Sequence, residues 1–365
     1  MRPDRYLKQF IFPEHDTHRT AEIFIVNPTV APMRQEADRS RLYVYDYDAN
    51  TIDHKELADT GSCYIYKHNN RTTWLNIDGI RKQDVEEISR QYGIHNLLVE
   101  DILSIGQRPK VDEIEGIMYC LLNMLYFNEE ECAVEQEQVS IVLGENFVIT
   151  FQEDEHRDVF NPVREKLKLH TSKIRQRSAD YLCYALLDMI VDQYFVVMEK
   201  LGEKIETLEE DIIRHGNTSS FGKINDLRKE LIVLKRNVSP VRDLVNGFIK
   251  SETELIDDNT TKYFKDVYDH IVQANDFVEN YRDMMTNLHD LYISKVNLRM
   301  NEVMKVLAIV TCLLAPATVI GGIFGMNFDV IPYAHQVWGF YATVILMLVI
   351  PLVMLIIFKR RGWFN

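Results

Sequence analysis

The chain has 365 residues, of which 46% are hydrophobic, so it is long enough for two domains with a sizeable core. Its formal net charge of −14 at pH 7 argues against a nucleic-acid partner, because a phosphate backbone has to be met by a basic surface. The five cysteines form no close pair, which argues against a zinc knuckle or a redox dithiol and fits a reducing compartment.

Residues 1–178 are predicted to form a cytosolic α/β domain. No signal peptide is expected, since residues 1–12 mix charged side chains with short apolar runs. Turn residues separate β-rich runs from helical stretches. The expected strands cover residues 41–45, 63–66, 72–77, 117–127 and 139–151, and the expected helices cover residues 82–92, 96–103 and 162–170. By itself this pattern indicates only a generic soluble domain.

Residues 179–258 are predicted to form long helices, because apolar residues recur at steps of three and four. The turn formers at residues 215–217 separate the two helices, and an Asp-Asp-Asn run at residues 257–259 caps the next helix. Residues 260–315 contain no Pro or Gly, so residues 259–325 are predicted to be one stalk helix that continues into a membrane.

Two segments near the C-terminus, residues 306–324 and 337–358, contain no charged side chain, and each is long enough to span a bilayer. Residues 326–336 then form an extracellular loop, and residues 359–365 form a basic cytosolic tail. The link between the spans carries no Lys or Arg. Basic residues lie instead before the first span, at Lys295, Arg299 and Lys305, and after the second span, at Lys359, Arg360 and Arg361. The positive-inside rule therefore predicts a multi-pass protein of the cell membrane with both termini in the cytosol.

One face of the stalk helix is polar along its whole length. It holds acidic and amide side chains in the cytosolic part and small or hydroxylic ones in the membrane part, with no Lys or Arg. At alternating steps of three and four it comprises Asp269, Gln273, Asp276, Asn280, Asp283, Asn287, Asp290, Ser294, Asn297, Asn301, Met304, Ala308, Thr311, Ala315, Thr318, Gly322 and Gly325. We call this face the polar stripe.

A charged stripe is ordinarily a solvated helix face. Solvated faces mix charges of both signs, however, whereas this stripe has no Lys or Arg. The stripe also keeps its register into the bilayer, and both observations argue against a merely solvated face. The opposite face is apolar and packs on protein or lipid. Close helix packing is the alternative for small membrane residues, and we reserve it for Ala317 and Gly321. Copies of the stripe around an axis would line a water-filled tube, so the chain is expected to form a homo-oligomer with the second span as its outer ring.

The first span ends at a Gly-Met-Asn triplet, residues 325–327. Gly325 is expected to end the helix in the left-handed conformation, and the turn then presents Asn327. Mg²⁺ gives up its hydration shell reluctantly, so neutral amide oxygens that accept hydrogen bonds from bound water suit a selective entrance.

The triplet, together with residues 107–110, 263–270 and 301–307, resembles the CorA family of magnesium and cobalt transporters. The resemblance covers nearly the whole chain and implies a funnel-shaped homopentamer that carries Mg²⁺. It also implies that residues 179–258 form an antiparallel pair of helices outside the stalk helix. It also implies that Asn301, Met304 and Leu307 narrow the cytosolic end of the pore, although Leu307 lies one residue off the polar stripe. Gly325, Met326 and Asn327 would select the hydrated ion.

The resemblance further implies regulatory Mg²⁺ sites between neighbouring cytosolic domains, which close the channel when internal Mg²⁺ is high. The matching carboxylates are Glu100, Asp101, Asp188 and Asp266. From the residues alone they are ordinary surface charge.

The sequence departs from the family pattern in the loop, where Tyr333 follows Pro332 in place of an acidic residue.

Two alternative functions remain open. One is a channel of this build with Co²⁺, Ni²⁺ or Zn²⁺ as its main ion, and the other is a membrane-anchored scaffold or signalling protein. We expect no enzyme activity, because no phosphate loop or nucleophile motif is found.

Overall fold

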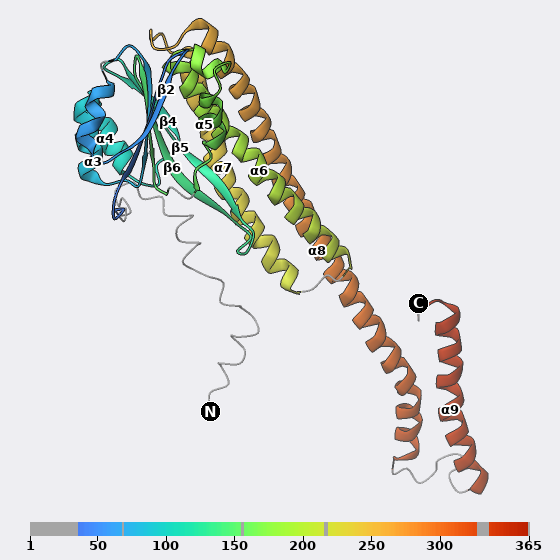
Figure 1. The fold of residues 1–365 in the computed structure, drawn as a ribbon. Helices are drawn as coiled ribbons and strands as arrows, with labels where there is room; N and C mark the ends of the chain where they lie inside the picture. The colour runs from blue at the N-terminus through green and yellow to red at the C-terminus, as the bar shows by residue number, and fades with distance from the viewer. Residues whose placement is uncertain (1–35, 68, 155–156, 215–217, 327–335, 364–365) are drawn as a thin grey trace. The chain divides into compact units, whose positions relative to one another are not determined.

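The computed structural model describes residues 36–67, 69–154, 157–214, 218–326 and 336–363 (Figure 1). The chain divides into two compact units, which are considered separately. The first comprises residues 1–210 and 219–288, and the second comprises residues 211–218 and 289–365.

A seven-stranded mixed sheet forms the centre of the first unit, in the order β2-β1-β3-β7-β6-β5-β4. Neighbouring strands are antiparallel, except that β3 and β7 are parallel. The strands are β1 (Arg41–Tyr47), β2 (Ile52–Leu57), β3 (Thr72–Asp78), β4 (Lys110–Ile114), β5 (Ile117–Asn128), β6 (Ala133–Leu143) and β7 (Phe147–Gln152). Every residue of β7 is buried, as expected for a central strand covered on both faces.

One face of the sheet is covered by α3 (Lys82–Tyr92), α4 (Asn96–Leu103) and the 3₁₀ helix η1 (Thr60–Tyr66) (Figure 1). Ile88 and Leu98 of these helices share a buried apolar cluster with Leu75 and Ile149 of the sheet. Helix α3 ends at Gly93, whose φ of 77° is in the left-handed region that glycine adopts without steric cost.

The opposite face is covered by α5 (Asn161–Lys168) and the first-unit parts of three long helices, α6 (Ala179–Arg214), α7 (Thr218–Lys250) and α8 (Asp258–Phe324) (Figure 1). Side-chain amides join α7 to the sheet: Asn123 Nδ2 donates to Asn237 Oδ1 at 2.6 Å, and Asn237 Nδ2 donates to Gln136 Oε1 at 2.9 Å. The Tyr194 hydroxyl of α6 donates to the Asn123 carbonyl oxygen at 2.7 Å. These bonds fix the positions of α6 and α7 on the sheet, since a buried amide without a partner is costly.

The structure corrects two predicted strands. Residues 63–66 belong to η1, whose first turn is capped by the Asp59 carboxylate accepting from Ser62 N at 2.9 Å. The predicted strand over residues 139–151 is instead the end of β6 and most of β7, separated by a turn in which Gly144 N donates to Phe147 O at 2.9 Å. Strands β2 and β4 were not predicted, because their polar, half-exposed sequences lack an apolar alternation.

The second unit contains the C-terminal part of α8 and α9 (Val337–Arg360), both long and apolar enough to cross a membrane. Mean hydropathy reaches 2.3 in α8 and 2.8 in α9. Helix α6 also passes this test at 1.4, but 67% of its apolar window is buried inside the protein, so α6 is a core helix. The predicted break at residues 215–217 lies outside the described residues.

Candidate functional site

The polar stripe of α8 is exposed throughout the first unit, while the opposite face of the same helix is buried. The exposed stripe residues are Asp269, Gln273, Asp276, Asn280, Asp283 and Asn287, and the buried residues are Val267, Ile271, Ala274, Val278, Met285 and Leu288. The apolar face therefore holds α8 on its own subunit. The stripe remains available to water, ions or another copy of the chain.

In the second unit the predicted pore-lining residues Asp290, Asn297, Asn301, Met304, Leu307, Thr311, Ala315, Thr318 and Gly322 are all exposed. Most neighbouring side chains of this part of α8 are exposed too, so exposure alone does not distinguish its faces. Asp290, Asn297 and Asn301 line a surface hollow of about 390 Å³, together with Ile293, Ser294 and Leu298. These three predicted residues thus border the same surface hollow.

The two threonine hydroxyls of the stripe each donate a hydrogen bond to a backbone carbonyl of α8. Thr311 Oγ1 donates to the Leu307 carbonyl at 2.8 Å, and Thr318 Oγ1 donates to the Leu314 carbonyl at 3.0 Å. A hydroxyl whose proton is used in this way keeps its lone pairs as acceptors. Exposed oxygen acceptors suit the waters around a hydrated cation, which present their hydrogens outward.

Of the Gly-Met-Asn triplet, Gly325 and Met326 are described and Asn327 lies outside the described residues. The expectation that Gly325 adopts the left-handed conformation is wrong, since its φ is not positive. Its N–H donates to the Gly321 carbonyl at 2.9 Å, and Met326 N donates to the Ile323 carbonyl at 3.3 Å. The helical turn therefore continues through Gly325. The bond from the Gly325 N–H also gives the Gly321 carbonyl, one of the last carbonyls of α8, a hydrogen-bond partner.

Two of the predicted regulatory carboxylates, Glu100 and Asp101, lie on α4. The Asp101 carboxylate is already engaged: Lys110 Nζ donates to its Oδ2 at 2.6 Å and Gln107 Nε2 donates to its Oδ1 at 2.9 Å. Glu100 is exposed. Within one chain, Asp101 therefore anchors the start of β4 to α4, and an ion that binds there has to compete with an ammonium group.

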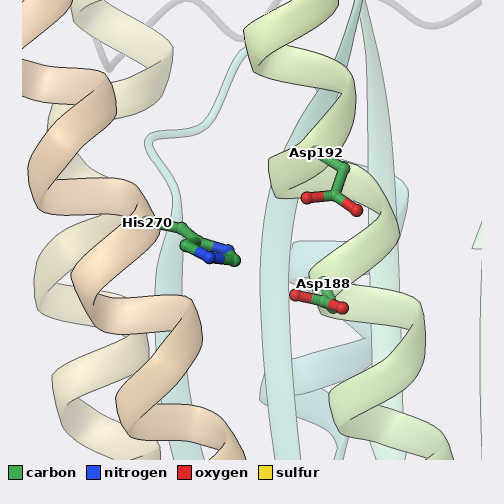
Figure 2. A group of neighbouring side chains, drawn as sticks. All are labelled: Asp188, Asp192 and His270. Atoms are coloured by element: carbon green, nitrogen blue, oxygen red, sulfur yellow. The ribbon is translucent and has the colours of Figure 1, made fainter.

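The other two, Asp188 of α6 and Asp266 of α8, lie on the opposite side of the sheet from α4 (Figure 1). Asp188 groups instead with Asp192 and His270, and one ligand atom from each of the three lies within 4.8 Å of the others. Figure 2 shows the imidazole of α8 pointing toward the two carboxylates of α6. Among the described residues, no other group of three or more metal-ligating side chains is this close.

The electrostatics of this group favour a cation. Burial, and then the neighbouring Asp192 carboxylate, raise the pKa of Asp188. The Asp266 carboxylate is near enough to add to that rise. Tyr184 Oη donates to Asp188 Oδ2 at 3.3 Å, while Asp188 Oδ1 is buried without a hydrogen-bond partner. A bound cation would supply the interaction that the second oxygen lacks.

Asp192 and His270 were not predicted from the sequence. The available signal was weak: Asp192 lies one helical turn after Asp188, and His270 one turn after Asp266, so each shares a helix face with a predicted carboxylate. Only the packing of α6 against α8 shows that these two faces meet.

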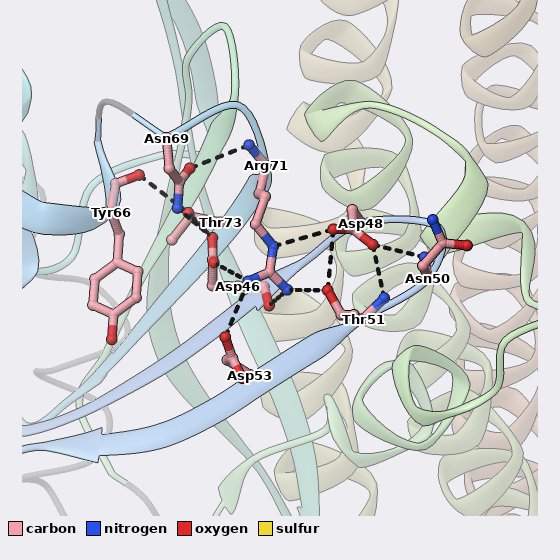
Figure 3. A network of polar contacts seen from close by, with 9 residues as sticks. All are labelled: Asp46, Asp48, Asn50, Thr51, Asp53, Tyr66, Asn69, Arg71 and Thr73. Atoms are coloured by element: carbon pink, nitrogen blue, oxygen red, sulfur yellow. Dashed lines mark hydrogen bonds and ion pairs between the residues drawn. The ribbon is translucent and has the colours of Figure 1, made fainter.

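A different acidic group, on the β1–β2 hairpin, is neutralised within the protein (Figure 3). Arg71 NH1 lies 2.9 Å from Asp46 Oδ2 and 3.0 Å from Asp53 Oδ2, and Arg71 Nε lies 3.5 Å from Asp48 Oδ2. Because a guanidinium occupies the centre of these carboxylates, the group stabilises the hairpin and offers no cation site.

Comparison with known proteins places this geometry in context. The model of the family described as CorA-like Mg²⁺ transporter protein matches residues 69–360. The cobalt/magnesium transport protein CorA of Thermotoga maritima is 37% identical over 321 residues, which cover 88% of this chain and 91% of that protein. The solved CorA magnesium transporter from Methanocaldococcus jannaschii has a similar fold, with a TM-score of 0.73 and 24% identity over 88% of this chain and 98% of that one.

Proposed function

Because the chain belongs to the family of CorA-like Mg²⁺ transporter proteins, we propose that it forms a homo-oligomeric membrane channel that admits hydrated Mg²⁺, and also Co²⁺. The observation that carries the proposal is the polar stripe of α8, which bears no Lys or Arg and runs into an apolar, membrane-length segment. One spanning helix cannot enclose water, so several copies, five by family resemblance, surround the pathway.

The proposed pathway works through oxygen acceptors. Asp290, Asn297 and Asn301 attract and orient the hydrated ion, and the Thr311 and Thr318 hydroxyls accept hydrogen bonds from its water shell. Asn327, with Gly325 and Met326, forms the entrance filter. Amide and hydroxyl oxygens can hold Mg²⁺ with its waters in place, which avoids the large cost of dehydrating it.

The membrane potential is the proposed driving force. It contributes about 2.3 kcal/mol per charge for each 100 mV, and about twice that for a divalent ion. With the cytosol negative, this free energy directs Mg²⁺ inward without ATP.

Internal Mg²⁺ is the proposed gating ligand, bound between the cytosolic domains of neighbouring subunits by Glu100, Asp101, Asp188 and Asp266. Bound cations screen the repulsion between carboxylates and favour the closed state, and their loss shifts the population toward the open state. The raised pKa of Asp188 supports this, because it reports an electrostatic environment that an added cation would relieve.

A related candidate function is transport of Co²⁺ as the main ion, which the name of the Thermotoga relative supports by giving cobalt together with magnesium. Flux measurements on the purified full-length chain in liposomes test both functions. Mg²⁺, Co²⁺, Ni²⁺ and Zn²⁺ are compared under an inside-negative potential. Potential-driven Mg²⁺ entry supports the main proposal, and faster Co²⁺ entry supports the second. Absence of any divalent flux from verified oligomers would favour a membrane-anchored scaffold.

A further inference from the structure

We infer that a basic segment of the first unit, residues 164–177, binds a free polyphosphate anion such as a nucleoside triphosphate, and that Tyr263 of α8 forms part of the site. The segment holds six Lys or Arg side chains and one carboxylate, and the difference gives a formal charge of +5 in a chain whose net charge is −14. The basic residues are Arg164, Lys166, Lys168, Lys173, Arg175 and Arg177. Positive charge gathered in this way attracts a multiply charged anion.

The basic segment is held in a fixed conformation by its own contacts. It runs from α5 through the 3₁₀ helix η3 (Lys173–Gln176) to the residues before α6. Arg175 is buried, and its Nε donates to the Asp48 carbonyl of the β1–β2 hairpin at 3.1 Å. Ser172 caps η3, since its hydroxyl accepts from Ile174 N at 3.4 Å. A ligand that binds here therefore does not have to order the segment first.

Three cations of the segment are free of carboxylate partners. Lys166 and Lys173 are exposed and Arg177 is half-buried, and none of them makes an ion pair with any residue that the structure describes. Other cations of the same unit behave differently: Arg71 contacts Asp46, and Lys110 contacts Asp101. The unpaired cations remain available to an anion from solution.

Two of these cations converge on one aromatic ring. Lys173 Nζ lies 5.7 Å from the centroid of the Tyr263 ring, and Arg177 Cζ lies 5.9 Å from it. The two charges are thus no farther apart than the sum of these distances, so one chain of phosphates can contact both. Their attraction to the ring is opposed by their mutual repulsion, which a bound anion would remove.

The position of Arg177 also favours an anion beside it. Arg177 lies two residues before Ala179, the first residue of α6. The N-terminal end of a helix carries a partial positive charge, so a cation placed there is unfavourable on its own. An anion next to Arg177 interacts favourably with both the guanidinium and the helix end.

An unused donor in the middle of the segment supports the site independently of the charge count. Arg175 NH2 is buried without a hydrogen-bond partner, whereas buried polar atoms are mostly paired. The neighbouring NH1 lies 3.2 Å from Nδ1 of His170, an exposed residue. Because a guanidinium can only donate, this Nδ1 is the acceptor. A phosphate oxygen that takes the place of the imidazole would reach NH1 and NH2 together, which is the paired geometry that guanidinium and phosphate groups share.

The spread of the cations sets the class of ligand. A single phosphate cannot contact the lysines of α5, Arg175 and the cations at Tyr263 at once, whereas a chain of phosphates can contact several of them. A long nucleic acid would also meet the acidic remainder of the surface, which repels it. A short polyphosphate needs only the basic segment.

Tyr263 lies one turn before Asp266 on α8, the helix that carries the polar stripe. In the proposed channel, polyphosphate binding is therefore expected to shift the internal Mg²⁺ concentration that halves the flux. This consequence rests on the proposed function, whereas the binding site itself does not.

The test is binding of ATP and of inorganic triphosphate to the purified full-length protein in detergent, measured by isothermal titration calorimetry at constant free Mg²⁺. Wild type is expected to bind both anions, and more weakly as salt rises, because phosphate contacts release counterions. A double variant, Lys173→Gln with Arg177→Gln, is expected to bind each anion roughly tenfold more weakly or worse, since it loses charge-assisted hydrogen bonds.

Matched variants separate the site from the overall charge. Lys55→Gln with Lys82→Gln removes two exposed lysines of the same unit outside the segment, and is expected to leave binding unchanged. Lys173→Arg keeps the charge and is expected to bind as wild type does. Lys173→Gln alone changes an exposed side chain, and it keeps the test valid if the double variant misfolds.

Two results would overturn the inference: equal ATP affinity in wild type, Lys173→Gln and the double variant, or no saturable binding of either anion. Inositol trisphosphate, a soluble lipid headgroup, is the third ligand. If it binds more tightly than both ATP and triphosphate, the site belongs to a lipid headgroup and the assignment to a free polyphosphate is overturned. Divalent flux without polyphosphate binding removes the site and leaves the channel, and binding that depends on Lys173 without any flux retains the site and removes the channel.

Discussion

Gly247 on α7 lies directly against the Val111 side chain on β4: a Cβ at residue 247 would come within 3.0 Å of Val111 Cγ1. Real Cβ atoms essentially never approach a neighbour that closely. The absence of a side chain at this one position lets α7 pack on the edge strand that also carries Lys110, the partner of Asp101.

Gly247→Ala is therefore expected to lower the free energy of unfolding, by about 1–3 kcal/mol as for an overpacked core position. The valine is stiff at χ1 and cannot turn away freely. Thermal unfolding of the detergent-solubilised protein measures the change. Adding Val111→Ala is expected to recover part of the loss, and a double variant no more stable than Gly247→Ala would show that the clash is not the cause.

Thr318→Val removes a hydroxyl from the polar stripe while keeping the shape of the side chain. If Thr318 Oγ1 accepts a hydrogen bond from the hydrated ion, Mg²⁺ flux is expected to fall about fivefold, equivalent to one net hydrogen bond of about 1 kcal/mol. Thr343→Val on α9 is the matched control, because Thr343 Oγ1 makes the same kind of bond to Gly339 O at 2.8 Å. Equal losses in the two variants would contradict a specific role for Thr318.

Asn327→Ala is expected to abolish Mg²⁺ flux and leave assembly intact, since it removes the amide oxygen proposed to hold the ion's water shell. Flux in liposomes and size-exclusion chromatography measure the two properties. Undiminished flux would exclude Asn327 from the filter.

Asp266→Asn is expected to weaken closure by internal Mg²⁺ and so to raise the concentration that halves the flux. The substitution removes one charged ligand of the proposed regulatory site, so a higher Mg²⁺ concentration is needed to occupy that site and close the channel. Asp243→Asn, an exposed carboxylate on α7 that lies 3.5 Å from Arg242, is the control. An inhibition curve identical to that of wild type would remove Asp266 from the gate.

The stability of the cytosolic domain is expected to depend on Glu137 of β6. Burial raises its pKa to about 7, against the lowering effect of the Asp154 and Glu153 N–H groups, which donate to its Oε1 at 3.0 and 2.9 Å. The folded state therefore holds a proton that the unfolded state releases above its ordinary value of 4.5. Stability is expected to fall as pH rises from about 4.5 to about 7 and then to level off.

Glu137→Gln keeps the acceptor oxygen and removes the titration. It is expected to flatten this part of the profile and to be more stable than wild type above pH 7, by up to about 1.4 kcal/mol per unit of pKa shift. Thermal unfolding across the pH range is the measurement. Parallel profiles for the two proteins would assign the pH dependence to other groups.

The sequence by itself determined the features that depend on local periodicity and hydropathy. The apolar segments within α8 and α9, helices α3 and α4, and the family resemblance were all predicted from neighbouring residues, and the structure and the comparisons confirm them. The polar stripe was found in the same way, because a helix repeats its faces every three or four residues.

Only the tertiary structure decided what depends on segments far apart in the chain. Helix α6 is as long as a membrane span, yet it is a core helix because the sheet and other helices bury its apolar face. Asp101 proved to be paired with Lys110, and Asp188 to meet His270. Such contacts are created when whole elements pack. The one-turn spacing of Asp266 and His270 places them on the same face of α8, but it does not show which other element this face meets, so His270 was not assigned beforehand.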